Sequence, residues 1–121
     1  MSETRRDVAD YLEDALDAME KAEAFVSNMS YEQFAVDDKT VYAVVRAVEI
    51  VGEAVKHIHQ DFRRAFTDIP WRDMAGMRDM LIHEYFGVDL ETVWNTVKVD
   101  IPKLKGPLRQ VLEKLPISAQ G

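Results

Sequence analysis

An arginine, an aspartate, a histidine and a tyrosine are grouped in the short stretch Met77–Gly87, inside an otherwise apolar helical pattern. On an α-helix Arg78 and Tyr85 share one face, because they are seven residues apart. Asp79 and His83 are four apart and therefore neighbours on an adjacent strip. The stretch thus combines a fixed cation, a titratable imidazole beside a carboxylate, and a phenol.

These residue types suit a site that binds an anion and moves a proton. Arg78 stays charged and can contact two phosphate oxygens at once. His83 lies in the last turn before the predicted helix stop at Gly87, where the helix dipole favours an imidazolium. The alternative from spacing alone is structural: a helix end with an Asp79–His83 hydrogen bond and Arg78 on the surface.

A second polar group interrupts the helix predicted over residues 39–66, which is apolar around most of its circumference. It forms a narrow strip of four residues at helical spacing: Arg46, Glu49, Glu53 and Gln60. One interpretation is a solvated strip with Arg46 and Glu49 paired. The other is that the strip faces a cleft beside Arg78 and His83. Gly52, in the middle of this helix, predicts close approach of another backbone.

Helical spacing of apolar residues also covers residues 4–26, the stretch around Arg78 and His83, and residues 89–115. Ser30 and Gln33 form a capping-box pattern for a short helix, and Asp37 or Asp38 can cap the next one. Pro70 and Trp71 suit the first turn of the Arg78 helix, with Asp68 as its cap.

In the last helical stretch, Asp89 provides the opening cap, and Pro102 is expected to kink or restart the helix. No alternating strand pattern competes. We therefore expect an all-α, four-to-five-helix antiparallel up-and-down bundle forming one domain over residues 1–121, with its core at about 5–115 and loose termini.

The composition restricts the classes of function. The net charge is −7, so any RNA contact needs a local basic cleft or basic residues pooled by oligomerisation. There is no cysteine, and no apolar run is long enough for a membrane span or a signal peptide. We expect a cytoplasmic protein without membrane contact.

Metal and cofactor sites are not predicted. On a continuous helix His57 and His59 would point about 160° apart, so they fit two surface histidines better than a metal site. Glu53 and His57 are four apart, whereas di-metal bundles use Glu-x-x-His. No Gly-rich phosphate loop or nucleophile elbow is present.

The pattern Arg78-Asp79-x3-His83-x-Tyr85 resembles the Arg-x4-His motif of HEPN domains, and more closely that of the HepT toxins. Three further segments are similar to the family's pattern and lie in the expected order: 42–54, 69–71, and 88–94. The resemblance covers roughly residues 5 to 115. Asp79 stands where the family usually has Asn or another polar residue.

The resemblance implies a HEPN-like bundle and a metal-independent ribonuclease toxin of a type VII-like toxin–antitoxin system, acting on tRNA or mRNA. Arg78 and His83 would be catalytic, with Asp79, Arg46, Glu49 and Glu53 in support. Two motifs would meet in a homodimer cleft, consistent with the nearly all-apolar helix as a dimer face.

The resemblance also implies a minimal nucleotidyltransferase as the antitoxin, which transfers AMP to Tyr85. The added phosphate beside Arg78 would block RNA. The alternative is a non-catalytic helical nucleotide-binding or adaptor subunit that partners a nucleotidyltransferase.

Overall fold

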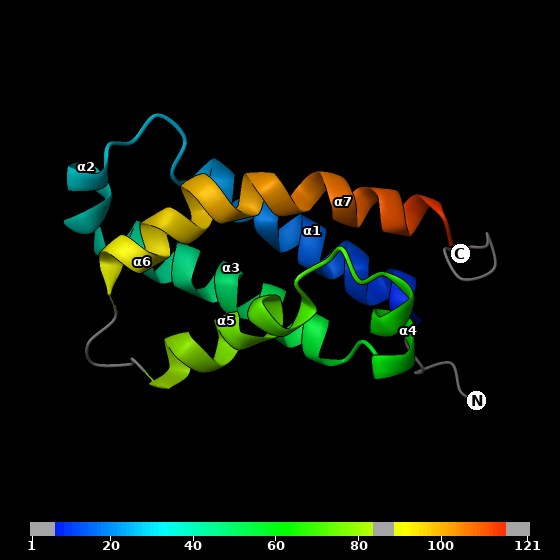
Figure 1. The fold of residues 1–121 in the computed structure, drawn as a ribbon. Helices are drawn as coiled ribbons and strands as arrows, with labels where there is room; N and C mark the ends of the chain where they lie inside the picture. Colours follow the sequence, from blue (N-terminus) through cyan, green and yellow to red (C-terminus); the bar gives the residue numbers. More distant parts are fainter. Residues whose placement is uncertain (1–6, 84–88, 116–121) are drawn as a thin grey trace.

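The computed structural model describes residues 7–83 and 89–115, and the regular structure in these ranges is entirely helical. The elements are α1 (Val8–Phe25), α2 (Tyr31–Ala35), α3 (Asp38–Lys56), α4 (Gln60–Ala65), α5 (Trp71–His83), α6 (Leu90–Asn95), the π-helical η1 (Thr96–Asp100) and α7 (Ile101–Glu113). The long passes α1, α3, α5 and α6–α7 alternate in direction (Figure 1). This confirms the predicted all-α antiparallel bundle.

The middle of the bundle is α3, which packs between α1 and α5, while α7 packs along α1 (Figure 1). Four valines at helical spacing on α3 are fully or almost fully buried: Val44, Val48, Val51 and Val55. They join a single apolar core cluster that also draws on the other long passes. Apolar burial of this kind is the main stabilising term, at about 25 cal/mol per Å².

The interpretation of the apolar α3 surface as a dimer face needs correction, because these valines are already covered inside the chain. Helix α3 contacts α1 on one side and α5 on the other, so both flanks of its apolar surface are used within one copy. What α3 leaves in solvent is a different strip, beginning at Tyr42, whose side chain is 76% exposed.

Three of the four caps predicted from the sequence are present. The Ser30 hydroxyl accepts from the Gln33 amide at 3.1 Å, and Gln33 Oε1 accepts from the Ser30 amide at 2.9 Å. Asp37 accepts from the Thr40 amide at 3.2 Å and so caps α3. Asp89 accepts from the Glu91 and Thr92 amides and caps α6. Each cap satisfies amides that have no partner within the helix.

The continuous helix predicted over residues 39–66 was wrong, because α3 ends at Lys56 and α4 begins at Gln60. The Arg63 guanidinium folds back and donates to the carbonyls of Val55 at 2.7 Å and Ile58 at 3.0 Å. The Val55 carbonyl also accepts from the Ile58 amide at 3.0 Å, so Arg63 adds a second donor there and a side-chain donor to Ile58, just beyond the end of α3. The break also removes Gln60 from the polar strip of α3.

Helix α5 begins at Trp71, directly after Pro70. The Met74 amide donates to the Pro70 carbonyl at 3.0 Å, and the buried Trp71 indole donates to the Phe66 carbonyl at 2.9 Å. Among the described residues, Asp68 makes no side-chain bond to the first turn, so the expected cap is not formed there. The indole bond and burial hold the start of the helix instead.

The last pass changes geometry as Pro102 predicts. The helix widens into the π-helical turn η1 and restarts as α7 with Pro102 in its first turn. A proline is accommodated there because the missing N–H needs no partner at a helix start. Within the described ranges, no helix has the length and apolarity required to cross a membrane.

Candidate active site

The backbones of α3 and α5 approach most closely at Gly52. A Cβ placed on Gly52 would lie 2.5 Å from the Arg78 amide nitrogen and 2.9 Å from the Arg78 Cβ. Only a glycine tolerates this separation, because any side chain would overlap the neighbouring backbone. The close approach predicted from the sequence is therefore confirmed, and the backbone it admits is that of Arg78.

The Arg78 side chain lies at the edge of this contact, 36% exposed. Its Nε is 3.4 Å from Glu53 Oε2, and its Nη1 is 3.8 Å from Asp79 Oδ1. Both separations exceed those of ordinary N–H···O hydrogen bonds. Among the described residues the guanidinium makes ion pairs and no hydrogen bond, so its donors remain able to bind an incoming anion.

Asp79 has a partner that sequence reasoning missed. Lys56, in the last turn of α3, donates to the two Asp79 oxygens at 3.1 and 3.3 Å. The group therefore holds two cations, Arg78 and Lys56, and two carboxylates, Glu53 and Asp79. The available signal was that Lys56 follows Glu53 by three residues, which places both on one side of α3.

The predicted polar strip on α3 divides into two parts. Glu53 reaches Arg78, as the cleft interpretation required. Arg46 and Glu49 lie 3.8 Å apart as a surface ion pair, with the Arg46 side chain 63% exposed, as the solvated interpretation required. The structure thus brings together Arg78, Asp79 and Glu53, and leaves Arg46 and Glu49 paired with each other.

His83 is the last residue of α5, one helical turn beyond Asp79. Its side chain and those of Met80, Leu81 and Ile82 lie outside the described part of the structure, as does all of the segment 84–88 with Tyr85, Phe86 and the helix stop expected at Gly87. The termini expected to be loose, 1–6 and 116–121, also lie outside it. Met77 is buried, as its place in the apolar pattern predicted.

The two histidines near the end of α3 each have a structural contact. The His57 ring stacks on Tyr11, with centroids 5.0 Å apart and an interplanar angle of 14°. His59 caps α4, because its Nδ1 accepts from the Asp61 amide at 3.1 Å. In the part of the chain that the structure describes, no group of three His, Cys, Asp or Glu residues is arranged to hold a metal ion.

The family model described as "Ribonuclease HepT-like" matches residues 15–111, which contain α3, α5 and the Gly52–Arg78 contact. The chain belongs to the HepT-like ribonuclease family. The resemblance drawn from Arg78, His83 and Tyr85 is thereby confirmed at the level of the family.

Individual relatives agree with this membership. The chain is 52% identical over 107 residues to "Probable ribonuclease HepT" from Thermococcus cleftensis, covering 88% of this chain and 97% of the relative. It is 44% identical over 111 residues to a "Putative RNase" from Methanocaldococcus jannaschii, covering 92% of each. It is 42% identical over 104 residues to a "Putative RNase" from Caldanaerobacter subterraneus, covering 86% of this chain and 93% of the relative. No solved structure matches the chain.

Proposed function

We propose that this chain is a metal-independent endoribonuclease, the toxin of a cytoplasmic toxin–antitoxin pair, that cleaves tRNA or mRNA through Arg78 and His83. The observation that carries the proposal is the place of Arg78: its backbone is held at the Gly52 contact, and its guanidinium lies 3.4 Å from Glu53. A positioned guanidinium with donors to spare is suited to a phosphate, which it can contact through two oxygens. His83 follows five residues later on the same helix.

The proposed reaction needs no metal. A ribose 2′-oxygen attacks the adjacent phosphorus, and the bond from phosphorus to the 5′-oxygen breaks. One proton leaves the 2′-hydroxyl, and one is delivered to the departing 5′-oxygen, giving a 2′,3′-cyclic phosphate and a 5′-hydroxyl. His83 handles one of these protons, since imidazole titrates near neutral pH. Arg78 stabilises the charge that builds on the phosphorane oxygens.

Glu53, Asp79 and Lys56 support this chemistry through position and charge. Glu53 and Asp79 limit where the Arg78 side chain can go, and the Lys56–Asp79 bonds tie α5 to the end of α3. The four charges balance in the free protein. A phosphate that binds Arg78 has to displace only the long contacts to Glu53 and Asp79, which are weaker than a bidentate arginine–carboxylate pair.

The active form is proposed to be a homodimer, because acid and base steps need two proton-transfer groups and each copy supplies one motif. The α3 strip in solvent comprises Tyr42, Arg46, Glu49 and Glu53, and it ends beside Arg78. A groove of about 320 Å³ between α1 and α3 runs beside it, with the half-exposed Phe25 at its edge. A second copy over this strip would bring its own motif to the same cleft.

Control by the antitoxin is proposed to act at Tyr85, through transfer of AMP from a nucleotidyltransferase. Arg78 and Tyr85 are seven residues apart, which on a continuing helix places them on one face. An added phosphodiester would give Arg78 an anion close by, and RNA would then have to displace it.

A nuclease assay on the purified full-length chain tests the proposal. Labelled tRNA and mRNA should be cut by the wild type and left intact by His83→Ala. The adaptor alternative predicts the opposite pattern: neither protein cleaves RNA, while both bind the nucleotidyltransferase equally well. Equal cleavage by the two proteins would remove His83 from the mechanism.

A further inference from the structure

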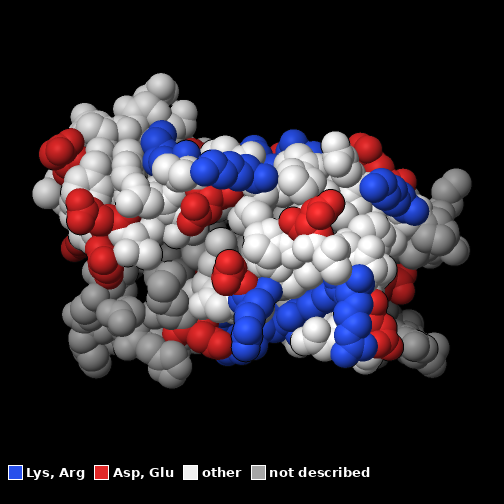
Figure 2. Space-filling view, in the orientation of Figure 1, with Lys and Arg blue, Asp and Glu red and all other residues white. Residues whose placement is uncertain are grey.

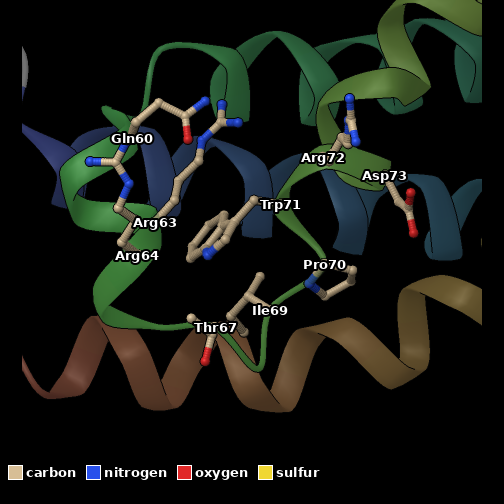
Figure 3. A pocket seen from close by; sticks show the side chains of 9 residues that line it. All are labelled: Gln60, Arg63, Arg64, Thr67, Ile69, Pro70, Trp71, Arg72 and Asp73. Atoms are coloured by element: carbon tan, nitrogen blue, oxygen red, sulfur yellow. The ribbon is translucent and has the colours of Figure 1, made fainter.

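A second basic feature lies away from Arg78, where α4 meets the start of α5. Figure 2 shows Lys and Arg side chains gathered over this corner. They surround an open pocket of about 560 Å³ whose lining includes Gln60, Arg63, Arg64, Trp71 and Arg72 (Figure 3). Three arginines around one pocket are notable in a chain of net charge −7. They supply a local basic cleft, one of the two sources of positive charge through which so acidic a chain is expected to contact RNA.

Arg63 is the fixed cation of the pocket. Its Nε and Nη2 donate to the carbonyls of Ile58 and Val55, so backbone groups hold the guanidinium in place. A guanidinium has five N–H donors, and the remaining ones have no carboxylate partner among the described residues. The cation is therefore oriented by the fold while its charge is left for a ligand.

Arg64 and Arg72 complete the basic lining from two helices. Arg64 is 74% exposed and pairs with Asp61 at 3.0 Å, an exposed ion pair of the kind that contributes little. Arg72 has no ion pair within the described ranges. The opposing charge in the lining is Asp73, which Figure 3 shows at the rim beyond Arg72. The lining thus carries three positive charges against one negative charge.

The pocket is connected to the proposed active site by one face of α5. Arg72, Gly76, Asp79 and position 83 follow one another at helical spacing on that face. At Gly76 a Cβ would meet no atom of the described side chains within 4 Å, so the helix surface is open at that position. Asp79 is the acidic group on this path, and Lys56 pairs with it at 3.1 Å. Eleven residues of helix separate Arg72 from position 83 by about 16 Å.

We infer that this pocket is a phosphate-binding subsite for the backbone of the RNA substrate, several nucleotides from the bond that is cut. The inference rests on the proposed ribonuclease function and extends it. About 16 Å corresponds to about five nucleotides of a stacked strand at 3.4 Å each. An RNA that is long enough to span the pocket and the active site binds at the two sites together. A dinucleotide binds only at the active site.

Binding is measured first, in the His83→Ala background so that the RNA stays intact. A fluorescent single-stranded 12-mer is titrated against full-length protein with and without Arg64→Glu and Arg72→Glu together. Arg63 is left unchanged because it holds backbone carbonyls. We expect the dissociation constant to rise about tenfold or more. The slope of log K against log salt concentration should become shallower by about 0.7 for each phosphate that the protein no longer neutralises.

Lys103→Glu is the matched control, because Lys103 is exposed on α7, on the far side of the bundle from α5 (Figure 1). Lys103→Glu alone reverses one charge. The double variant Lys98→Glu with Lys103→Glu reverses two charges, as the arginine pair does, so the two double variants have the same net charge. If these controls weaken binding of the 12-mer as much as the arginine pair does, the effect is general electrostatics and the subsite is overturned.

Cleavage separates this inference from the proposed function. With His83 intact, the arginine pair should lower kcat/KM for the 12-mer about tenfold more than for a dinucleotide. An equal loss on both substrates overturns the subsite, because it places the effect at the active site. Arg-dependent binding of the 12-mer without any cleavage keeps the pocket as a binding site for RNA phosphates and refutes the ribonuclease. Unchanged RNA binding together with loss of nucleotidyltransferase binding makes the pocket a protein-docking surface and also overturns the inference.

Discussion

Gly52 of α3 and Arg78 of α5 lie so close that a methyl group on Gly52 would stand 2.5 Å from the Arg78 amide nitrogen. The contact sets the position of α5 along α3 and the rotation of α5 about its own axis. It thereby determines where the Arg78 side chain projects from the helix. Glu53, the residue after Gly52, meets that side chain. The packing contact and the chemical contact are therefore adjacent.

Gly52→Ala should separate the two helices and displace Arg78. Overpacking of a tight contact typically costs about 1–3 kcal/mol, so we expect a lower melting temperature and a larger relative loss of RNA cleavage. Gly76→Ala is the control for stability, because Gly76 lies on α5 where an added Cβ has open space, and the change should stabilise the helix by up to about 1 kcal/mol. The melting temperatures of the two variants should therefore shift in opposite directions. A Gly52→Ala protein with normal stability and activity would contradict the role given to this contact.

The proposed dimer predicts that the wild type sediments at twice 13.9 kDa at micromolar concentration. Tyr42→Glu should produce a monomer and abolish cleavage, because it replaces the exposed aromatic ring at the start of the proposed interface with a charge. Val99→Glu makes a similar change at an apolar side chain that is 44% exposed on η1, and it should remain a dimer. A wild-type monomer that cleaves RNA at full rate would refute the shared cleft.

Asp89 predicts a pH effect on stability that is independent of catalysis. The Thr92 hydroxyl donates to its carboxylate at 2.9 Å and, with the Thr92 and Glu91 amides, holds the pKa of Asp89 below its ordinary 3.8. A lowered folded-state pKa contributes stability above the ordinary pKa, and that contribution is lost as pH falls through the folded value. Asp89→Asn keeps a cap but loses the charge. Its melting temperature should lie below wild type at neutral pH and converge with it below pH 3.8. A gap that stays constant with pH would contradict this account.

For control by the antitoxin, co-expression with the cognate nucleotidyltransferase should add one or more AMP units to the chain at Tyr85. Tyr85→Phe should stay unmodified and remain toxic despite the partner. Mass spectrometry of peptides locates the adduct, and Tyr42→Phe is a control because Tyr42 is a strongly exposed tyrosine on α3. An adduct on Tyr11, Tyr31 or Tyr42 would refute the assignment and leave the nuclease untouched.

Much of the bundle could be predicted because its signals are local. The caps at Ser30, Asp37 and Asp89 each depend on residues only two or three positions apart in the sequence. Gly52 predicted a close backbone approach, although the sequence alone did not specify which backbone.

What could not be predicted depends on contacts between separate segments. The break after Lys56 is stabilised by the hydrogen bond from Arg63 to the Val55 carbonyl, eight residues away. The periodicity of apolar residues gives no indication of that bond. The Lys56–Asp79 pair joins two helices 23 residues apart in sequence. The basic pocket likewise forms only when α4 folds against the start of α5.

Arg78 is proposed to promote attack by the ribose 2′-hydroxyl without a metal. The most direct measurement is the yield of 2′,3′-cyclic phosphate ends from a defined RNA in EDTA, compared between the wild type, Arg78→Ala and Arg109→Ala. Arg109 is the matched control, because it also pairs with a glutamate, Glu20, but lies on α7. We predict cyclic phosphate ends from the wild type and from Arg109→Ala, and a loss of about 100-fold or more in the rate of Arg78→Ala. Cleavage abolished by EDTA, or an Arg78→Ala protein as active as Arg109→Ala, would contradict the account.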